Sequence, residues 1–201
     1  YLYCSFNRLT SLTFPVNCRH INCECNNLSE FDIQKHSALE TLNMSDNILV
    51  NLNISECKEL TKLVCKNNKL NSFKIESCLH LKYLDISDCS GIITEVTLSH
   101  FPLLHTMLCN NTNIKRLVIQ NCYNIIKFEC NNTNLENLYM YGMRALEQLC
   151  CQNNKLNTLT LNELVKLKEL DCSNNELKTI DITKCDHLER AFCQDNQLEK
   201  N

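Results

Sequence analysis

The chain has 201 residues, 44% of them hydrophobic, and its 20 basic and 23 acidic side chains give a net charge of −3. This balance argues against a general phosphate-binding surface, which needs a concentrated basic footprint. No apolar run approaches the roughly 20 residues of a membrane span. We therefore expect neither a nucleic-acid partner nor membrane insertion.

Glycine and proline contribute only two residues each, whereas cysteine contributes 16. The turns must therefore be built from other residues, and asparagine is the obvious candidate because it tolerates turn conformations. This share of cysteine is at the edge of what suggests a disulfide scaffold. A chain of this length can nevertheless bury a core without disulfides, so the positions of the cysteines must decide.

One pattern recurs from the start of the chain to its end. With Cys65 as the anchor, the equivalent positions are Cys4, Cys23, Met44, Cys65, Ile86, Cys109, Cys130, Cys151, Cys172 and Cys193. Successive steps are 19, 21, 21, 21, 23, 21, 21, 21 and 21 residues. A nearly constant period over ten copies is typical of a repeat protein. The step of 23 predicts a two-residue insertion and a bulged turn around Ser90 and Gly91.

Each copy begins with L-x-x-L-x-C-x-x-N-x-L, and its second half repeats the same apolar spacing. The asparagine position holds Asn7, Asn26, Asn47, Asn68, Asn154, Asn175 and Asn196, and Cys89, Thr112 and Thr133 replace it in the other three copies. In the second halves, 70–75, 114–119, 156–161 and 177–182 alternate inward and outward with many β-branched residues. This alternation favours strands over helices.

The pattern resembles the leucine-rich repeat family, whose consensus is L-x-x-L-x-L-x-x-N/C-x-L. The short 21-residue copy with cysteine in a core position is most similar to bacterial repeats of the internalin type. The resemblance implies a mainly β leucine-rich repeat solenoid with little helix. A parallel strand is expected on the concave side, and a second short strand or extended segment on the convex side. We expect residues 1–201 to form a single domain of about ten repeats, with the terminal caps in flanking sequence or the uncapped ends self-associating.

The repeat stacks equivalent side chains of neighbouring coils about 4.8 Å apart. The anchor cysteines should form one inward column and Cys57, Cys78, Cys122 and Cys185 a second. Parallel strands hold these Cβ atoms side by side rather than converging, which disfavours disulfides. We therefore expect buried free thiols that pack as small hydrophobes, and an asparagine column that bonds the turn backbone.

Two outward positions of the first strand supply the candidate partner-binding residues, because the resemblance implies that partners dock on the concave sheet. They are Lys62, Val64, Tyr83, Asp85, Thr106, Leu108, Lys127, Glu129, Gln148, Glu169, Asp171, Arg190 and Phe192. Apolar side chains among charges suit an interface, but scattered surface apolar residues are also ordinary. On the opposite side Tyr139 and Tyr141 form either an aromatic contact patch or simple strand packing.

No catalytic constellation emerges. The six histidines are not paired at recurrent spacing with a nucleophile and an acid. Cys18, His20, Cys23 and Cys25 lie close together, but they lack a C-x-x-C knuckle and Cys23 belongs to the core column. We expect no enzyme activity, no metal site and no cofactor.

The resemblance implies a non-catalytic scaffold that binds a protein partner through the concave sheet, in adhesion or host interaction. The alternative is the substrate-recognition segment of a larger secreted bacterial effector whose catalytic domain lies elsewhere. A secreted or cell-surface bacterial protein is the favoured location, with a host-delivered effector or a cytoplasmic protein as alternatives.

Overall fold

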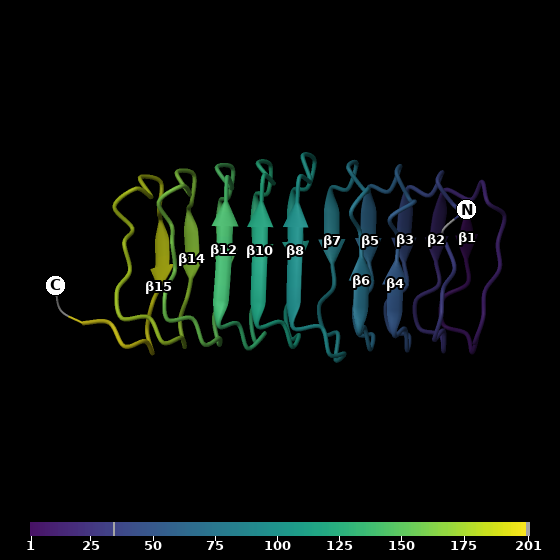
Figure 1. Ribbon diagram of the computed structural model, residues 1–201, viewed down its shortest axis with the longest axis horizontal. Helices are drawn as coiled ribbons and strands as arrows, with labels where there is room; N and C mark the ends of the chain where they lie inside the picture. The colour runs from purple at the N-terminus through teal and green to yellow at the C-terminus, as the bar shows by residue number, and fades with distance from the viewer. Residues whose placement is uncertain (34, 200–201) are drawn as a thin grey trace.

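The computed structural model of the protein describes residues 1–33 and 35–199. In this part of the chain the backbone winds into a parallel β-solenoid with its two ends at opposite ends of a long body (Figure 1). The described residues form no helix, and so none that is long and apolar enough to cross a membrane. The expected mainly β solenoid is confirmed.

One side of the solenoid is a ten-stranded parallel sheet, the long sheet, within the described residues. Each strand comes from the first half of one sequence copy, and neighbouring coils pair in register. In order across the sheet the strands are β1 (Leu2–Tyr3), β2 (His20–Asn22), β3 (Thr41–Asn43), β5 (Lys62–Val64), β7 (Tyr83–Asp85), β9 (Thr106–Leu108), β11 (Lys127–Glu129), β13 (Gln148–Cys150), β14 (Glu169–Asp171) and β15 (Arg190–Phe192).

The opposite side, here called the back, is less regular. Its described strands form a pair, β4 (Asn51–Asn53) with β6 (Ser72–Lys74), and a separate triplet, β8 (Glu95–Ser99), β10 (Arg116–Gln120) and β12 (Asn137–Tyr141). The strands predicted within 70–75 and 114–119 are confirmed as β6 and β10. The segments 156–161 and 177–182 form no strand, which agrees with the expected short strand or extended segment on this side. Each of these two segments is preceded by a main-chain hydrogen bond to the previous coil. Lys155 N–H donates to Leu135 O (2.8 Å), and Glu176 N–H donates to Leu156 O (2.9 Å).

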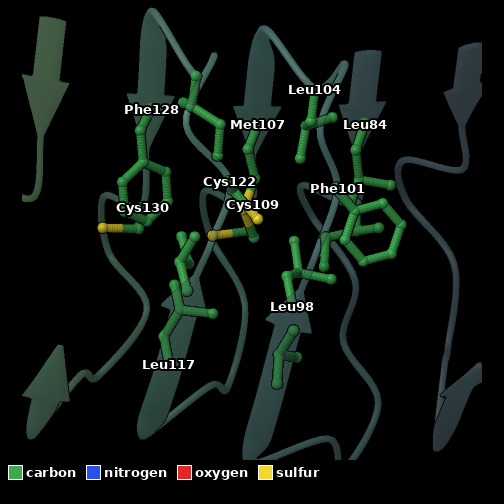
Figure 2. Packing of buried hydrophobic residues seen from close by; sticks show 14 of the residues in the cluster. Leu84, Leu98, Phe101, Leu104, Met107, Cys109, Leu117, Cys122, Phe128 and Cys130 are labelled. Atoms are coloured by element: carbon green, nitrogen blue, oxygen red, sulfur yellow. The ribbon is translucent and has the colours of Figure 1, made fainter. Parts of the chain in front are cut away.

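The core lies between the two sides and is filled by leucine, isoleucine, phenylalanine, methionine and cysteine side chains (Figure 2). All sixteen cysteines are free thiols, as expected. The anchor cysteines form a cysteine ladder under the long sheet; Cys65, Cys109 and Cys130 in it are fully buried. At the end of this ladder the sulfurs of Cys172 and Cys193 lie 3.6 Å apart without a covalent bond. Packing, and not cross-linking, accounts for the cysteines.

Burial also fixes the ionisation state of these thiols. Removal from water raises the pKa of Cys23 to about 12, and it raises the pKa of Cys65 and Cys130 well above the ordinary value. In the second cysteine column, burial raises the pKa of Cys57 to about 11 and that of Cys78 to about 12. These groups are therefore uncharged at neutral pH.

The asparagines form a second ladder at the turn that follows the long sheet. Asn68 donates from Nδ2 to the carbonyl oxygens of Cys65 (3.0 Å) and Lys66 (3.1 Å) in its own coil and of Met44 (3.1 Å) in the preceding coil. Its Oδ1 accepts from Leu49 N–H of the preceding coil at 3.0 Å. One buried carboxamide thus ties two coils together and satisfies main-chain groups that lack sheet partners.

Where asparagine is replaced, the side chain makes fewer bonds. The thiol of Cys89 donates to Cys65 O at 3.4 Å, and Thr112 Oγ1 donates to Cys109 O at 3.1 Å. Thr133 donates to Cys130 O at 3.2 Å and also to the carboxamide oxygen of Asn154 at 2.9 Å. Cysteine and threonine thus make fewer hydrogen bonds at this turn than the carboxamide of asparagine.

The residue just before each ladder position has a positive φ, for example 48° at Asn67 and 60° at Asp88. This left-handed conformation usually calls for glycine, but asparagine and aspartate tolerate it. Most coils have one of these two residues there: Asp46, Asn67, Asp88, Asn111, Asn132, Asn153, Asn174 and Asp195. A chain with two glycines can therefore turn at every coil.

The two-residue insertion lies where the back splits into two sheets. Gly91 packs so closely on the preceding coil that a Cβ atom there would lie 1.7 Å from Leu70 O. Ser90 N–H donates to Asn68 O (2.9 Å), and Ile92 N–H donates to Asn71 Oδ1 (3.1 Å). The inserted residues are thus held against the preceding coil, and β8 begins only at Glu95, without pairing with β6.

Candidate protein-interaction surface

The outer face of the long sheet carries two parallel files of side chains. In most strands the central residue is buried and the two flanking residues are partly exposed, as in β9 and β11. Because neighbouring strands pair in register, Lys62, Tyr83 and Thr106 lie side by side in one file, and Val64, Asp85 and Leu108 in the other. The structure therefore brings the predicted residues together on one surface.

The predicted residues differ in how far they reach into solvent. Lys62 and Arg190 are exposed, and Phe192 is 49% exposed. The partly exposed ones are Val64, Tyr83, Thr106, Leu108, Lys127, Glu129, Gln148, Glu169 and Asp171.

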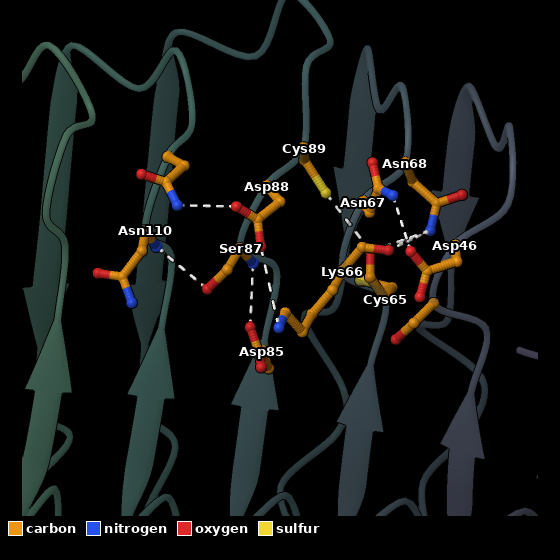
Figure 3. A network of polar contacts seen from close by, with 12 residues as sticks. Asp46, Cys65, Lys66, Asn67, Asn68, Asp85, Ser87, Asp88, Cys89 and Asn110 are labelled. Carbon is orange, nitrogen blue, oxygen red and sulfur yellow. Dashed lines mark hydrogen bonds and ion pairs between the residues drawn. The ribbon is translucent and has the colours of Figure 1, made fainter. Parts of the chain in front are cut away.

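Asp85 departs from the expectation of an accessible side chain, since it is only 4% exposed. The larger Val64 and Leu108 flank it in register on the two neighbouring strands. Its carboxylate accepts a hydrogen bond from Ser87 N–H at 3.0 Å (Figure 3). The Asp85 side chain therefore stabilises the turn after β7 and is a poor candidate for contact with a partner.

Aromatic and charged groups meet on the β5–β7 part of the surface. The Lys62 Nζ lies 5.3 Å from the centre of the Tyr83 ring, within the range of a cation–π contact. Burial, and after it the nearby Asp85 carboxylate, raises the pKa of Tyr83. The hydroxyl thus stays protonated and can act as a hydrogen-bond donor toward a partner.

An ion pair occupies the next part of the surface. Lys127 Nζ lies 2.7 Å from Glu129 Oε1, and Asn110 Nδ2 donates to Glu129 Oε2 at 2.9 Å. Burial acts to raise the pKa of Glu129, but the hydrogen bonds from Lys127 and Asn110 outweigh it and lower the pKa. The bond to Glu129 in turn raises the pKa of Lys127. Both groups are charged across the neutral range.

A third cluster links the last strands of the sheet. Glu169 accepts from Gln148 Nε2 at 3.3 Å and from the Arg190 guanidinium. Cys150, between Glu129 and Asp171 in register, is partly exposed. Burial, together with the carboxylates of Glu129 and Asp171, raises its pKa to about 11, so its thiol is not an activated nucleophile at neutral pH.

Comparison with known proteins identifies the fold. No protein-family model matches the sequence, and no curated protein is significantly similar to it. Among solved structures, the functional domain of InlJ from Listeria monocytogenes, which includes a cysteine ladder, is similar with a TM-score of 0.81 and 28% sequence identity. The chain has the solenoid fold of leucine-rich repeat proteins. The similarity covers 90% of this chain and 40% of that one.

Two further structures share the solenoid at lower identity. The internalin InlF from Listeria monocytogenes str. 4b F2365 matches with a TM-score of 0.57 and 16% identity over 92% of this chain and 63% of that chain. A chain of the LRIM1/APL1C complex matches with a TM-score of 0.61 and 20% identity over 87% and 38%. This leucine-rich repeat chain thus spans 40% and 63% of the lengths of the InlJ and InlF chains that it resembles.

The cysteine and histidine group near the start of the leucine-rich repeat chain is not brought together. Cys18 and Cys23 are buried, and Cys23 belongs to the ladder. A different trio, Glu24, Cys25 and Asp46, places its side-chain ligand atoms within 4.8 Å of one another. Glu24 already accepts a hydrogen bond from Asn43 (3.1 Å) and Asp46 one from Asn67 (2.7 Å). We assign no metal to these partly exposed groups.

One polar file along the rim of the long sheet escaped the sequence analysis. Asn67 donates to Asp46 at 2.7 Å (Figure 3), Asn111 to Asp88 at 2.7 Å and Asn132 to Asn111 at 3.0 Å. These are the left-handed turn residues, so the file borders the candidate surface of the leucine-rich repeat domain. The sequence feature that could have predicted this file is the asparagine or aspartate that directly precedes most positions of the asparagine ladder.

On the back, the rings of Tyr139 and Tyr141 lie parallel with centroids 6.4 Å apart. The Arg116 guanidinium lies 5.0 Å from the Tyr139 ring, and the Tyr139 hydroxyl donates to Asn137 Oδ1 at 3.2 Å. Tyr141 remains half exposed. These contacts stay within β10 and β12, which fits strand packing better than a dedicated patch.

Proposed function

We propose that this leucine-rich repeat protein is a non-catalytic recognition module whose protein partner docks on the outer face of the long sheet. The observation that carries the proposal is the pair of in-register side-chain files on that face. The asparagine ladder holds the turns beside these files in place through buried hydrogen bonds. A surface ordered before binding loses less conformational entropy on association.

The chemistry of the face suits a protein partner. Val64, Tyr83 and Leu108 form a central apolar group, and Lys127 with Glu129 and Glu169 with Arg190 supply charges beyond it. An apolar centre with a polar rim is the usual organisation of protein interfaces. We therefore place the main contact across β5 to β11, with the charged pairs setting orientation.

The likeness to two internalins supports recognition at a bacterial surface, in adhesion or host interaction, by a secreted or surface-bound protein. The alternative, a recognition segment of a larger secreted effector, would use the same surface. The full-length reading frame separates them, because a surface anchor supports the first setting and a catalytic domain supports the second.

A charge swap tests the docking face without removing an ion pair. The variant K127E/E129K reverses both outward charges, which lie 2.7 Å apart in the wild-type chain, and keeps one charge of each sign. The matched control K115E/E136K swaps an exposed pair on the back, where the nitrogen and oxygen lie 3.6 Å apart. Each protein is immobilised and used to capture proteins from host-cell membrane extracts, with quantification by mass spectrometry.

We expect a partner that the wild-type chain and the back-side control both capture, and that the long-sheet variant captures about tenfold less, equivalent to about 1.4 kcal/mol. Equal loss with both variants would indicate a nonspecific charge effect. Loss with the back-side variant alone would place the interface on the other face. Either result contradicts the proposal.

A further inference from the structure

The back of the solenoid contains a cleft where the two-residue insertion separates β6 from β8. Its volume is about 910 Å³, and its walls are formed by residues 71–76 and 92–101. The strands β5 and β7, which belong to the same two coils, pair directly in the long sheet. Figure 1 shows β6 and β8 further apart than β4 and β6 or β8 and β10, with β7 visible between them. The back thus opens at this place, between two successive coils.

Both walls of the cleft are strand edges without a strand partner among the described residues. Directly before β8, Thr94 O accepts from Arg116 N–H (3.0 Å) at the start of β10, on the side away from the cleft. Main-chain groups alternate in direction along a strand of a parallel sheet. Those of Glu95, Thr97 and Ser99 therefore point into the cleft.

The same argument applies to the other wall. On β6, Lys74 O accepts from Ile54 N–H (3.0 Å) toward β4, so the main-chain groups of Phe73 point toward β8. The two edges run in the same direction, because β6 and β8 follow β5 and β7 in successive coils and β5 and β7 pair in parallel. A main chain entering between them meets donors and acceptors on both sides.

The floor and rim of the cleft are apolar. Phe73 and Ile93 are only partly buried against the core, and they also line a small cavity of about 10 Å³ beneath the cleft. Leu79 is 49% exposed and Ile92 is 74% exposed along the walls. Because the cavity below is too small to admit a bulky group, inward side chains of a bound segment would rest on the Phe73 and Ile93 surfaces.

We propose that this cleft binds an extended peptide segment of another protein, which adds as a parallel strand between β6 and β8. Main-chain hydrogen bonds on two edges provide affinity, and alternate apolar side chains facing Phe73 and Ile93 provide selectivity. A second copy of the solenoid does not fit this role, because its described strands are built into packed coils. The ends of the described chain lie at the far ends of the body (Figure 1). This site is independent of the docking face on the long sheet.

The test uses a synthetic peptide with the sequence of residues 93–100, which has the length and alternation of a back strand. Binding of the labelled peptide is followed by fluorescence anisotropy and by hydrogen exchange. We expect saturable 1:1 binding and slower exchange at the amides of Phe73, Thr97 and Ser99. The same peptide with N-methyl groups on alternate amides should bind at least about tenfold more weakly, since one set of main-chain bonds is lost.

Protein variants test the site from the other side. Thr97→Pro removes an N–H that faces the cleft, a position where an edge strand tolerates proline, and should reduce binding about tenfold, whereas Thr97→Ala should not. Ile92→Asp should weaken binding, and the control Ile182→Asp, at an exposed position outside the cleft, should leave it unchanged. Circular dichroism and urea denaturation check that each variant is folded.

Three results would overturn the proposal. The first is no saturable binding at millimolar peptide. The second is equal binding of the N-methylated peptide, because side chains alone would then account for the affinity. The third is protection of the cleft amides that depends on protein concentration without peptide, because a second copy would then be the occupant.

Discussion

The three central coils that lack ladder asparagines differ from the coils on either side. They carry Cys89, Thr112 and Thr133 at the asparagine position, and these side chains make one or two hydrogen bonds each. The same coils contain β8, β10 and β12, the five-residue strands of the back. Flanking coils with ladder asparagines have three-residue back strands or, among the described residues, none.

The comparison indicates two ways to hold neighbouring coils together. In the flanking coils a carboxamide such as Asn68 makes four hydrogen bonds at the turn. In the central coils, longer strand pairing on the back replaces some of these hydrogen bonds. Five residues of β10 are in register with β8 and with β12. A hydrogen bond contributes about 1 kcal/mol net to stability. The carboxamide at the turn and the longer strand pairing on the back therefore stabilise neighbouring coils by comparable amounts.

Alkaline pH should have the largest effect on folding stability, because it favours ionisation of the buried thiols that are present in both regions. Burial raises the pKa of Cys89 to about 11 and that of Cys23 and Cys78 to about 12. Each buried thiol stays protonated in the folded chain but ionises near pH 9 in the unfolded chain. Its contribution to stability is complete below pH 9 and is lost as pH rises toward the folded pKa, by about 1.4 kcal/mol per thiol at one unit above 9.

Several such losses together approach the whole stability of a domain, about 5–15 kcal/mol. Urea midpoints measured under reducing conditions at pH 7.5, 9 and 10 should therefore fall moderately between the first two, by about 0.4 kcal/mol per buried thiol, and steeply at the third. Added salt serves as the control, because it screens general charge repulsion but not the ionisation of buried thiols. A midpoint that stays flat to pH 10 would contradict buried free thiols.

Substitution at the ladder position should separate the two regions. Asn68→Ala leaves Leu49 N–H and the carbonyls of Met44 and Cys65 without their carboxamide partner, and should cost about 3 kcal/mol. Thr112→Ala removes one bond and should cost about 1 kcal/mol. Urea denaturation of both variants measures the difference. Equal costs would mean that the carboxamide adds nothing beyond a single hydroxyl.

Much of this architecture could be predicted from the sequence because the period and the buried residue types act locally in every coil. The long sheet, the free thiols and the asparagine turns follow from which side chains recur and how they stack. Within the candidate surface, the register of the files was also predictable. The burial of Asp85 was not, because it depends on the size of Val64 and Leu108 on the neighbouring strands.

The back was harder to predict for a similar reason. The segments 156–161 and 177–182 have the same apolar alternation as 114–119, yet only the last lies in a strand. Whether an extended segment forms a ladder depends on its distance from the next coil, which the alternation does not encode. The step of 23 residues located the insertion, but not the separation of β6 from β8 that accompanies it.

The last expected effect concerns that insertion. Gly91→Ala places a Cβ atom 1.7 Å from Leu70 O, so the backbone of residues 90–92 must move. We expect a cost of about 2 kcal/mol, comparable to overpacking elsewhere, and faster hydrogen exchange at the amides of Ser90 and Ile92, which now bond to Asn68 and Asn71. The exposed neighbour provides the control, since Ser90→Ala keeps the same main-chain bond. If Gly91→Ala is as stable as Ser90→Ala, the inserted turn is not held against the preceding coil, and the separation of β6 from β8 needs another cause.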